Sequence, residues 1–458
     1  MAPKKPIFAP AKPASMHIEL SGHYSYRRIV KAMAPMAAMM IVTSIYSVID
    51  GFFISNFAGS DAFAGMNIIW PGIALVAALG LMVGAGGSAL VSKTFGEGDP
   101  ERANRIFSML VRLTLIGGTA IGALMFILMP PLAKALGADA VLLPHSVAYG
   151  RILVCSMPLY MLQLTFQPFF MVAERPQLGT MMSIASGIAN ILFDALFVAG
   201  LGWGLKGAAL ATVISFIVGG GYPLWYFSSR RNRTQLKLVR SRFDWRAIAK
   251  SCTNGLSEFV GNIALNIIGI CYNLQLMKYI GANGVSAYGI LMYLGFIFAA
   301  AFIGYNMGIT QVVAFNYGAG NTEEMKSLLR KSLVLIAVGG VAVTLFAEIS
   351  AGTVARIFVG YDRELTELTI HATRIYMLSF LICGFNMFTS AWFTALGNGI
   401  VSAVAAFVRT LVFELAAVFA LPHFFGIDGI WAAVNVAEIL ALILSTALIL
   451  SFRKRYRY

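Results

Sequence analysis

Long apolar stretches separated by short polar ones recur along the whole of this 458-residue chain. Most of them hold on the order of 20 residues or more, the length that an α-helix needs to cross the hydrocarbon layer of a bilayer. The runs predict twelve spans, at 29–56, 62–92, 105–129, 147–172, 178–201, 205–228, 249–278, 284–315, 330–351, 370–395, 398–421 and 428–452. We therefore expect an all-α integral membrane protein.

Composition supports this fold class, because 59% of the residues are hydrophobic and only 12% are charged. Soluble proteins carry about twice that share of charge. The first apolar run is much longer than the roughly 7 to 15 residues of a signal-peptide core, so we expect no cleavable secretory signal. The proline-containing leader before it predicts a disordered tail or an upstream start, to which we assign no function.

The two halves of the chain repeat each other at an offset of 222 residues. Phe95-Gly96-Glu97-Gly98-Asp99 corresponds to Tyr317-Gly318-Ala319-Gly320-Asn321, and the same offset relates Gly86 to Gly308 and Gly207 to Gly429. In both loops glycine permits a turn, and Asp99 or Asn321 can cap the helix that follows. An even number of spans in each repeat predicts two six-helix lobes of like orientation, related by a pseudo-twofold axis along the membrane normal.

This repeat predicts the organisation of the chain. We expect an N-terminal tail (1–28), an N-lobe (29–228), a basic linker (229–248), a C-lobe (249–452) and a C-terminal tail (453–458). Two such lobes can enclose a central cavity and rock about it, which gives alternating access.

Basic residues are distributed unevenly between alternate loops, with 23 on the side of the two termini and 7 on the other side. By the positive-inside rule both termini should be cytoplasmic. The net charge of +14 is thus explained by topology and does not indicate a nucleic-acid partner. The seven basic residues of 229–246 could also bind anionic membrane lipid, but a linker that fixes orientation is the favoured interpretation.

Two carboxylates lie deep in the apolar spans of the first half, at Asp50 and Asp194. Charge inside a bilayer is costly, so each needs a partner or a function. Tyr46 and Asn190 each stand four positions earlier and therefore share a helical face with the carboxylate. Such a set could bind H⁺, or Na⁺ through Asp50, Asp194 and Asn190, because oxygen ligands suit a hard cation. The alternative is that both carboxylates only hydrogen-bond within the bundle.

These features together resemble the MATE (multidrug and toxic compound extrusion) family over residues 25 to 452. The resemblance rests on the loops related by the 222-residue offset, on the two carboxylate helices and on the start of the sixth span at Gly207. It is nearer to the DinF-like and MepA-like branch, which implies an ion-coupling site of Asp50, Tyr46, Asn190, Asp194 and Thr212. It also implies a monomer in a bacterial cytoplasmic (inner) membrane, with H⁺ or Na⁺ as the coupling ion and no other cofactor.

The second half departs from the NorM-like branch of the family. Glu258 has no nearby proline, and the tenth span holds no Asp or Glu. Arg409 and Glu414 are too far round a helix to pair neatly, so Arg409 should neutralise Glu258 or Glu438. We favour a structural charge network for these four residues over a second ion site.

The fourth span offers a candidate substrate surface, at Met161, Gln163, Phe166 and Gln167. Methionine and aromatic side chains adapt to varied apolar ligands, and amides add polar contacts. The alternative is ordinary helix packing, which accounts for most such residues in a membrane protein.

The sequence thus favours a secondary antiporter that exports amphipathic, often cationic drugs. A lipid or lipid-linked oligosaccharide flippase is the alternative, but it would need several basic residues in the cavity, and only Arg409 lies deep in a span. An ATP-driven pump or an intramembrane enzyme is disfavoured, because the chain lacks a phosphate-binding Gly-x-x-x-x-Gly-Lys-[Ser/Thr] loop and the histidine and serine motifs of hydrolases.

Overall fold

The computed structural model describes residues 18–458, except for the side chains of Ser47, Val48, Phe52, Ser55 and Ser60. Residues 1–17, most of the expected N-terminal tail, lie outside the described residues. In the described residues, eleven helical segments are long and apolar enough to cross a membrane, and a bent pair of helices makes a twelfth. The expected all-α membrane fold is confirmed.

The first half contains α1 (Tyr26–Phe53), α2 (Ser60–Gly96), α3 (Pro100–Ala135), α4 (Leu142–Cys155), α5 (Met157–Val172), α6 (Pro176–Asp194), α7 (Gly204–Phe216) and α8 (Tyr222–Ser228). Short π-helical segments continue three of these helices, namely η1 (Ile54–Ala58), η2 (Ala195–Gly200) and η3 (Ile217–Gly221). The bent pair is α4 and α5, which meet at an angle of 60° and form the expected fourth span.

The second half contains α9 (Trp245–Asn254), α10 (Leu256–Tyr279), α11 (Ala282–Gly318), α12 (Thr322–Val359), α13 (Arg363–Tyr376), α14 (Phe380–Ala395), α15 (Gly399–Phe407), α16 (Leu415–Ala420) and α17 (Pro422–Tyr456). A 3₁₀ turn, η4 (Met377–Ser379), joins α13 to α14, and a π-helical segment, η5 (Val408–Glu414), joins α15 to α16. The expected span at 249–278 differs from the structure, since the helix is interrupted at Gly255 and the short helix α9 precedes it.

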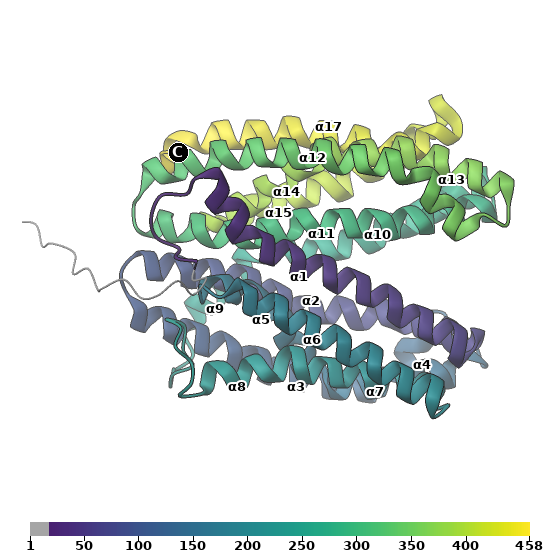
Figure 1. Cartoon of the computed structure of the whole chain (residues 1–458), viewed down its shortest axis with the longest axis horizontal. Helices are drawn as coiled ribbons and strands as arrows, with labels where there is room; N and C mark the ends of the chain where they lie inside the picture. Colours follow the sequence, from purple (N-terminus) through teal and green to yellow (C-terminus); the bar gives the residue numbers. More distant parts are fainter. Residues whose placement is uncertain (1–17) are drawn as a thin grey trace, which may run out of the picture.

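The helices form two groups, with α1 crossing between them (Figure 1). α1 packs against α6 of the first half and against α11 of the second. We call the end of the molecule that holds the start of α1, the end of α17 and the loops 97–99 and 319–321 the terminal face.

The lobes approach each other closely toward the terminal face. Gly96 lies against the carbonyl of Phe315, and Gly318 lies against that of Lys93, so a side chain at either glycine would collide with backbone. Glycine allows two helix backbones to come this close inside a membrane. The Ser92 hydroxyl also donates to the Gln311 carbonyl oxygen over 2.6 Å. The two lobes are therefore in direct contact on this side.

The repeated loops at the terminal face are built as the sequence predicted. Gly98 and Gly320 have φ angles of 83° and 69°, which favour glycine. Asp99 accepts a hydrogen bond from the Arg102 N–H and caps α3, and Asn321 accepts one from the Glu324 N–H and caps α12. The shared offset thus reflects two copies of one helix connection.

Candidate functional site

The two carboxylates of the N-lobe stand on neighbouring helices, α1 and α6. The helices pack along much of their length, because Gly187 of α6 lies against the ring of Tyr46 and the Thr180 hydroxyl donates to the Pro35 carbonyl over 2.6 Å. Asp50 lies near the end of α1, and Asp194 is the last residue of α6.

The carboxyl groups of Asp50 and Asp194 face each other, and the Asn190 amide lies beside Asp50. Asn190 and Asp194 are buried, at 2% and 0% exposure. A close pair of carboxylates this deep in the fold cannot both carry an uncompensated charge without a large electrostatic cost. The two side chains act as one unit.

Apart from the contact between the Asp50 and Asp194 carboxyl groups themselves, several oxygen atoms in this group lack a hydrogen-bond partner among the described residues. They are Oδ1 of Asp50, both carboxyl oxygens of Asp194, Oδ1 of Asn190, Oγ1 of Thr212 and the Tyr149 hydroxyl. Buried polar atoms are normally paired, and leaving one unpaired costs roughly 1 to 3 kcal/mol. Such a concentration of unpaired oxygens fits a proton or a hard cation such as Na⁺.

Tyr46 and Thr212 belong to the same region. The Tyr46 hydroxyl lies against Gln163 of α5. The Ser186 and Ser215 hydroxyls, 2.7 Å apart, join α6 to α7. The two helices run antiparallel. Asn190 lies one turn after Ser186 on α6, and Thr212 lies one turn before Ser215 on α7, so Asn190 and Thr212 lie at the same level.

Tyr149 is a member of this group that the sequence did not identify. It lies on α4, is 1% exposed, and its hydroxyl is close enough to Asp50 and Asp194 to interact with both electrostatically. A lone tyrosine in an apolar helix carries no distinguishing sequence signal, because most such residues pack in cores. Its place beside the carboxylates depends on how α4 packs in the lobe, which the sequence pattern does not encode.

Both carboxylate helices pass into π-helical turns just beyond the acidic residue. η2 begins directly after Asp194, and η1 begins four residues after Asp50. π-helical turns are uncommon and are often found at functional sites, because they leave backbone groups out of the regular ladder. No hydropathy pattern predicts them.

A small cavity opens within the N-lobe among α1, α5, α6 and η3. Its lining includes Gln163 and Gln167 together with Met39, Phe170, Gly179, Met182, Ser183 and Gly219. Met161 and Phe166 do not line it. Met161 packs in the interior of the lobe, and Phe166, which is fully buried, packs against Phe107 and Phe227. Both residues lie on a side of α5 that packs inside the lobe. The hydropathy pattern locates the span but does not indicate which side of the helix lines the cavity.

In the C-lobe, the acidic residues are differently placed. Glu438 Oε1 accepts a hydrogen bond from Nε of Arg409 at 2.8 Å and lies 2.7 Å from its Nη2, and Oε2 of Glu438 accepts a hydrogen bond from Asn386 at 2.6 Å. The Ser445 hydroxyl in turn donates to Asn386. Arg409 thus neutralises Glu438, one of the two partners expected from the sequence.

Glu414 and Glu258 lie outside this pair. Glu414 ends η5 and faces the Tyr272 hydroxyl, and Glu258 stands in the first turn of α10. In the part of the chain that the structure describes, no group of three or more His, Cys, Asp and Glu side chains could hold a metal ion. The N-lobe pair is therefore distinguished by its unpaired oxygens and not by the number of its acidic ligands.

Comparison with known proteins decides the family. The MatE family model matches residues 35–196 and again residues 259–419, so most of the chain is covered by two copies of one pattern. The chain belongs to the MATE family. Its members are transporters and not enzymes. The two matched stretches start 224 residues apart, close to the 222-residue offset of the repeated loops.

Individual MATE relatives agree over nearly the full length. The multidrug export protein MepA of Staphylococcus haemolyticus is 24% identical over 438 residues, which cover 94% of this chain and 96% of that protein. MepA of Staphylococcus aureus strain MSSA476 is 22% identical, with 94% of each chain covered.

Solved structures show the same fold. An outward-facing MATE family transporter of the MOP superfamily has a TM-score of 0.89 and 23% identity, covering 98% of this chain and 99% of its own. A MATE structure in complex with MaL6 also has a TM-score of 0.89, with 22% identity and 96% and 100% coverage. At these identities the likeness is one of fold.

Proposed function

We propose that this MATE transporter is a secondary antiporter that exports amphipathic, often cationic compounds in exchange for H⁺ or Na⁺. The observation that carries the proposal is the facing pair Asp50 and Asp194 with unpaired carboxylate oxygens. Net transport against a gradient requires a coupling ion whose binding differs between two states of the protein. A carboxylate pair between two helices supplies such a difference, because small helix shifts change its charge and ligand geometry.

Each residue of the N-lobe group has a role in this proposal. Asp50 and Asp194 take up the proton, or hold Na⁺ together with the Asn190 carbonyl oxygen. Tyr46, Thr212 and Tyr149 supply hydroxyl groups that stabilise the bound form by about 0.5 to 1.5 kcal/mol each.

The substrate is proposed to enter beside this site. Gln163 lies against Tyr46 and also lines the cavity with Gln167, so it connects the ion site to the cavity. The cavity has room for only about one water molecule in this structure, so a drug would bind there in a state in which the cavity is wider. Binding of that drug and binding of the ion next to it would compete, which is the property an antiporter requires. We retain Gln163 and Gln167 as substrate contacts and assign Met161 and Phe166 to packing.

A flippase for lipid-linked oligosaccharides is the second candidate function, and the C-lobe pairing argues against it. Recognition of a pyrophosphate needs free guanidinium or ammonium groups. The Arg409 guanidinium is bonded to Glu438. An anionic headgroup would have to displace a buried carboxylate.

The proposed topology places the terminal face in the cytoplasm of a bacterium, in its inner membrane. The support is the excess of basic residues in the loops of this face.

The proposal is tested by dye efflux from everted membrane vesicles in which a proton gradient and a sodium gradient are imposed separately. We expect one of the two gradients to drive transport of a cationic dye. Dye transport that needs neither gradient, or vesicles that move no dye under either, would contradict the antiporter assignment.

A further inference from the structure

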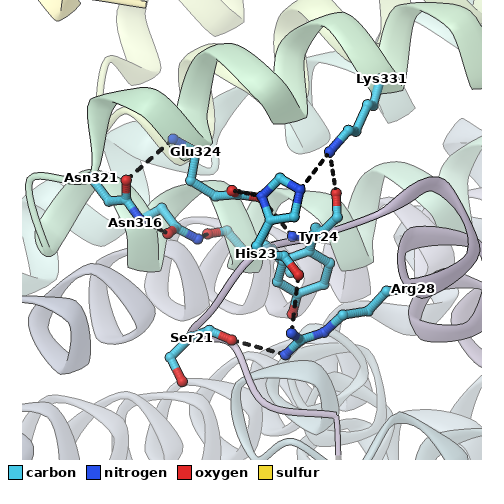
Figure 2. A network of polar contacts seen from close by, with 9 residues as sticks. Ser21, His23, Tyr24, Arg28, Asn316, Asn321, Glu324 and Lys331 are labelled. Carbon is cyan, nitrogen blue, oxygen red and sulfur yellow. Dashed lines mark hydrogen bonds and ion pairs between the residues drawn. The ribbon is translucent and has the colours of Figure 1, made fainter.

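A short segment before α1, residues 18–25, lies between the two lobes on the terminal face (Figure 2). It differs from the free tail expected from the sequence. On the C-lobe side, both oxygens of the Glu324 carboxylate hold it, since Oε1 accepts from the Tyr24 N–H at 2.8 Å and Oε2 lies 2.7 Å from His23 Nδ1. Lys331 donates to the Tyr24 carbonyl oxygen from the same helix, α12. We call residues 18–25 the strap.

The strap is also attached to the N-lobe. The Leu20 N–H donates to Oε1 of Glu174 over 3.0 Å. Glu174 lies in the turn between α5 and α6, the two helices that carry Gln163 and Asp194. The strap therefore bridges a turn of one lobe and a helix of the other. At each end, a carboxylate accepts a hydrogen bond from a backbone N–H of the strap.

The strap is folded internally as well as tied at its ends. The Arg28 guanidinium donates to the carbonyl oxygens of Glu19, Ser21 and His23 at 3.0, 2.9 and 3.1 Å and lies 4.5 Å from the centre of the Tyr24 ring. The Tyr24 hydroxyl donates to the Glu19 carbonyl at 2.6 Å. Burial raises the pKa of that hydroxyl well above its usual range, so it remains a donor at neutral pH. These bonds fix the strap in one defined conformation.

Apolar side chains of the strap fill the space between the lobes. Leu20 and Tyr24 are fully buried, in one cluster with Met171 of the N-lobe and with Met325 and Leu328 of the C-lobe. Burying a large apolar side chain in this way stabilises the arrangement that buries it by about 1.5 to 3 kcal/mol. The strap thus adds to the closure that the glycine contacts of α2 and α11 already make.

We propose that the strap is a latch that fastens the two lobes together on the cytoplasmic face and favours the state in which this face is closed. The inference rests on the proposed alternating access and topology. Opening the cytoplasmic side must move the α5–α6 turn away from α12, and a segment bonded to Glu174 and Glu324 cannot follow both. One attachment has to break in every cycle, so its strength helps to set the ratio of the two states.

The test compares two substitutions in one turn of α12. Glu324→Ala removes the carboxylate that holds the strap, whereas Glu323→Ala removes a carboxylate that is 86% exposed and contacts only Lys326 in the described residues. Spin labels on cysteines introduced at Glu101 and Arg330, one in each lobe, report the separation of the lobes. The four native cysteines, which are free in the structure, are first replaced by serine.

We expect Glu324→Ala to raise the ratio of long to short inter-lobe distances by roughly tenfold, the effect of losing charge-assisted hydrogen bonds. Glu323→Ala should leave the distribution unchanged. His23→Ala, whose side chain is 71% exposed, removes only a strap contact and should give an intermediate shift. Added to Glu324→Ala it should have little further effect, because the bond between His23 and Glu324 is already lost and only the 3.4 Å contact of His23 with Lys331 remains to be removed.

Identical distance distributions in the unsubstituted protein, Glu324→Ala and His23→Ala would overturn the latch. His23→Ala keeps the test decisive if Glu324→Ala does not fold. The distances are measured without substrate or gradient, so this outcome is independent of transport. Conversely, a protein whose strap substitutions shift the distances but whose vesicles export nothing would refute the proposed function and leave the latch standing.

Discussion

Asp194 and Glu438 are both carboxylates buried within a lobe, and their surroundings separate their roles. Glu438 is matched by Arg409 and Asn386, whereas Asp194 faces only the carboxyl group of Asp50 and has no other hydrogen-bond partner among the described residues. A matched charge stabilises one arrangement, and an unmatched one responds to whatever ion reaches it. This contrast is the reason to place ion coupling in the N-lobe.

At the residue scale, we predict that Glu438→Gln lowers thermal stability markedly. The substitution leaves the Arg409 guanidinium, whose side chain is only 25% exposed, without its counter-charge, a loss of roughly 3 kcal/mol. Melting in detergent, followed by circular dichroism or a dye, measures the change. Glu348→Gln is the control. Glu348 forms a loose ion pair of 3.8 Å with the largely exposed Arg374, and such pairs contribute about 0 to 1 kcal/mol to stability. Equal melting temperatures for the two variants would contradict a structural role for the C-lobe pair.

The sequence identified most residues of the N-lobe group, since a carboxylate in an apolar span is conspicuous and its i−4 neighbour shares its face. That Asp50 and Asp194 face each other depends on how α1 and α6 pack, which no local pattern encodes. Tyr149 was missed for the same reason. Arg409 had two possible partners by sequence, and only the packing of α15, η5 and α17 selected Glu438.

At the scale of elements, the span pattern predicted the eleven candidate membrane helices and the bent pair of the described residues, because length and hydropathy are local properties. It failed at Gly255, where α9 and α10 divide. The cause is a long-range contact, since this glycine lies against the backbone of Met82 in the other lobe. The π-helical turns and the ordered strap likewise depend on contacts between distant parts of the chain.

We predict that Gly255→Ala disrupts the contact between the lobes. A Cβ atom there would overlap the Met82 carbonyl, and overpacking of this kind costs about 1 to 3 kcal/mol. Gly261→Ala is the matched control, because nothing lies within 4 Å of a Cβ at that position in the adjoining helix α10. We expect a lower melting temperature for the first variant and an unchanged or slightly higher one for the second. A neutral effect of Gly255→Ala would show that the lobes can separate here at no cost.

At the scale of the whole molecule, the proposed direction of export requires the terminal face to be cytoplasmic. We predict that a cysteine at Arg233, in the basic linker, reacts with a membrane-impermeant maleimide in everted vesicles but not in intact cells. A cysteine at Arg363, which is exposed at the start of α13, should show the opposite pattern. Labelling of the linker cysteine in intact cells would show that the terminal face, and the strap with it, lies outside the cell, and would contradict the proposed topology.

We propose that Asp50 and Asp194 form the coupling site of this MATE transporter, and Asp50→Asn is the substitution that bears on this site alone. Asparagine keeps the volume and a hydrogen bond but takes up no proton and holds sodium weakly, so the difference in ion affinity between the two states is lost. The measurement is gradient-driven dye efflux from everted vesicles, with dye binding to the purified protein as the check on folding. Glu101→Gln, an exposed change on α3, is the control. We predict that Asp50→Asn abolishes efflux while dye binding persists, and that Glu101→Gln leaves both efflux and dye binding unchanged. Normal gradient-driven efflux by Asp50→Asn would show that the carboxylate is structural and that coupling lies elsewhere.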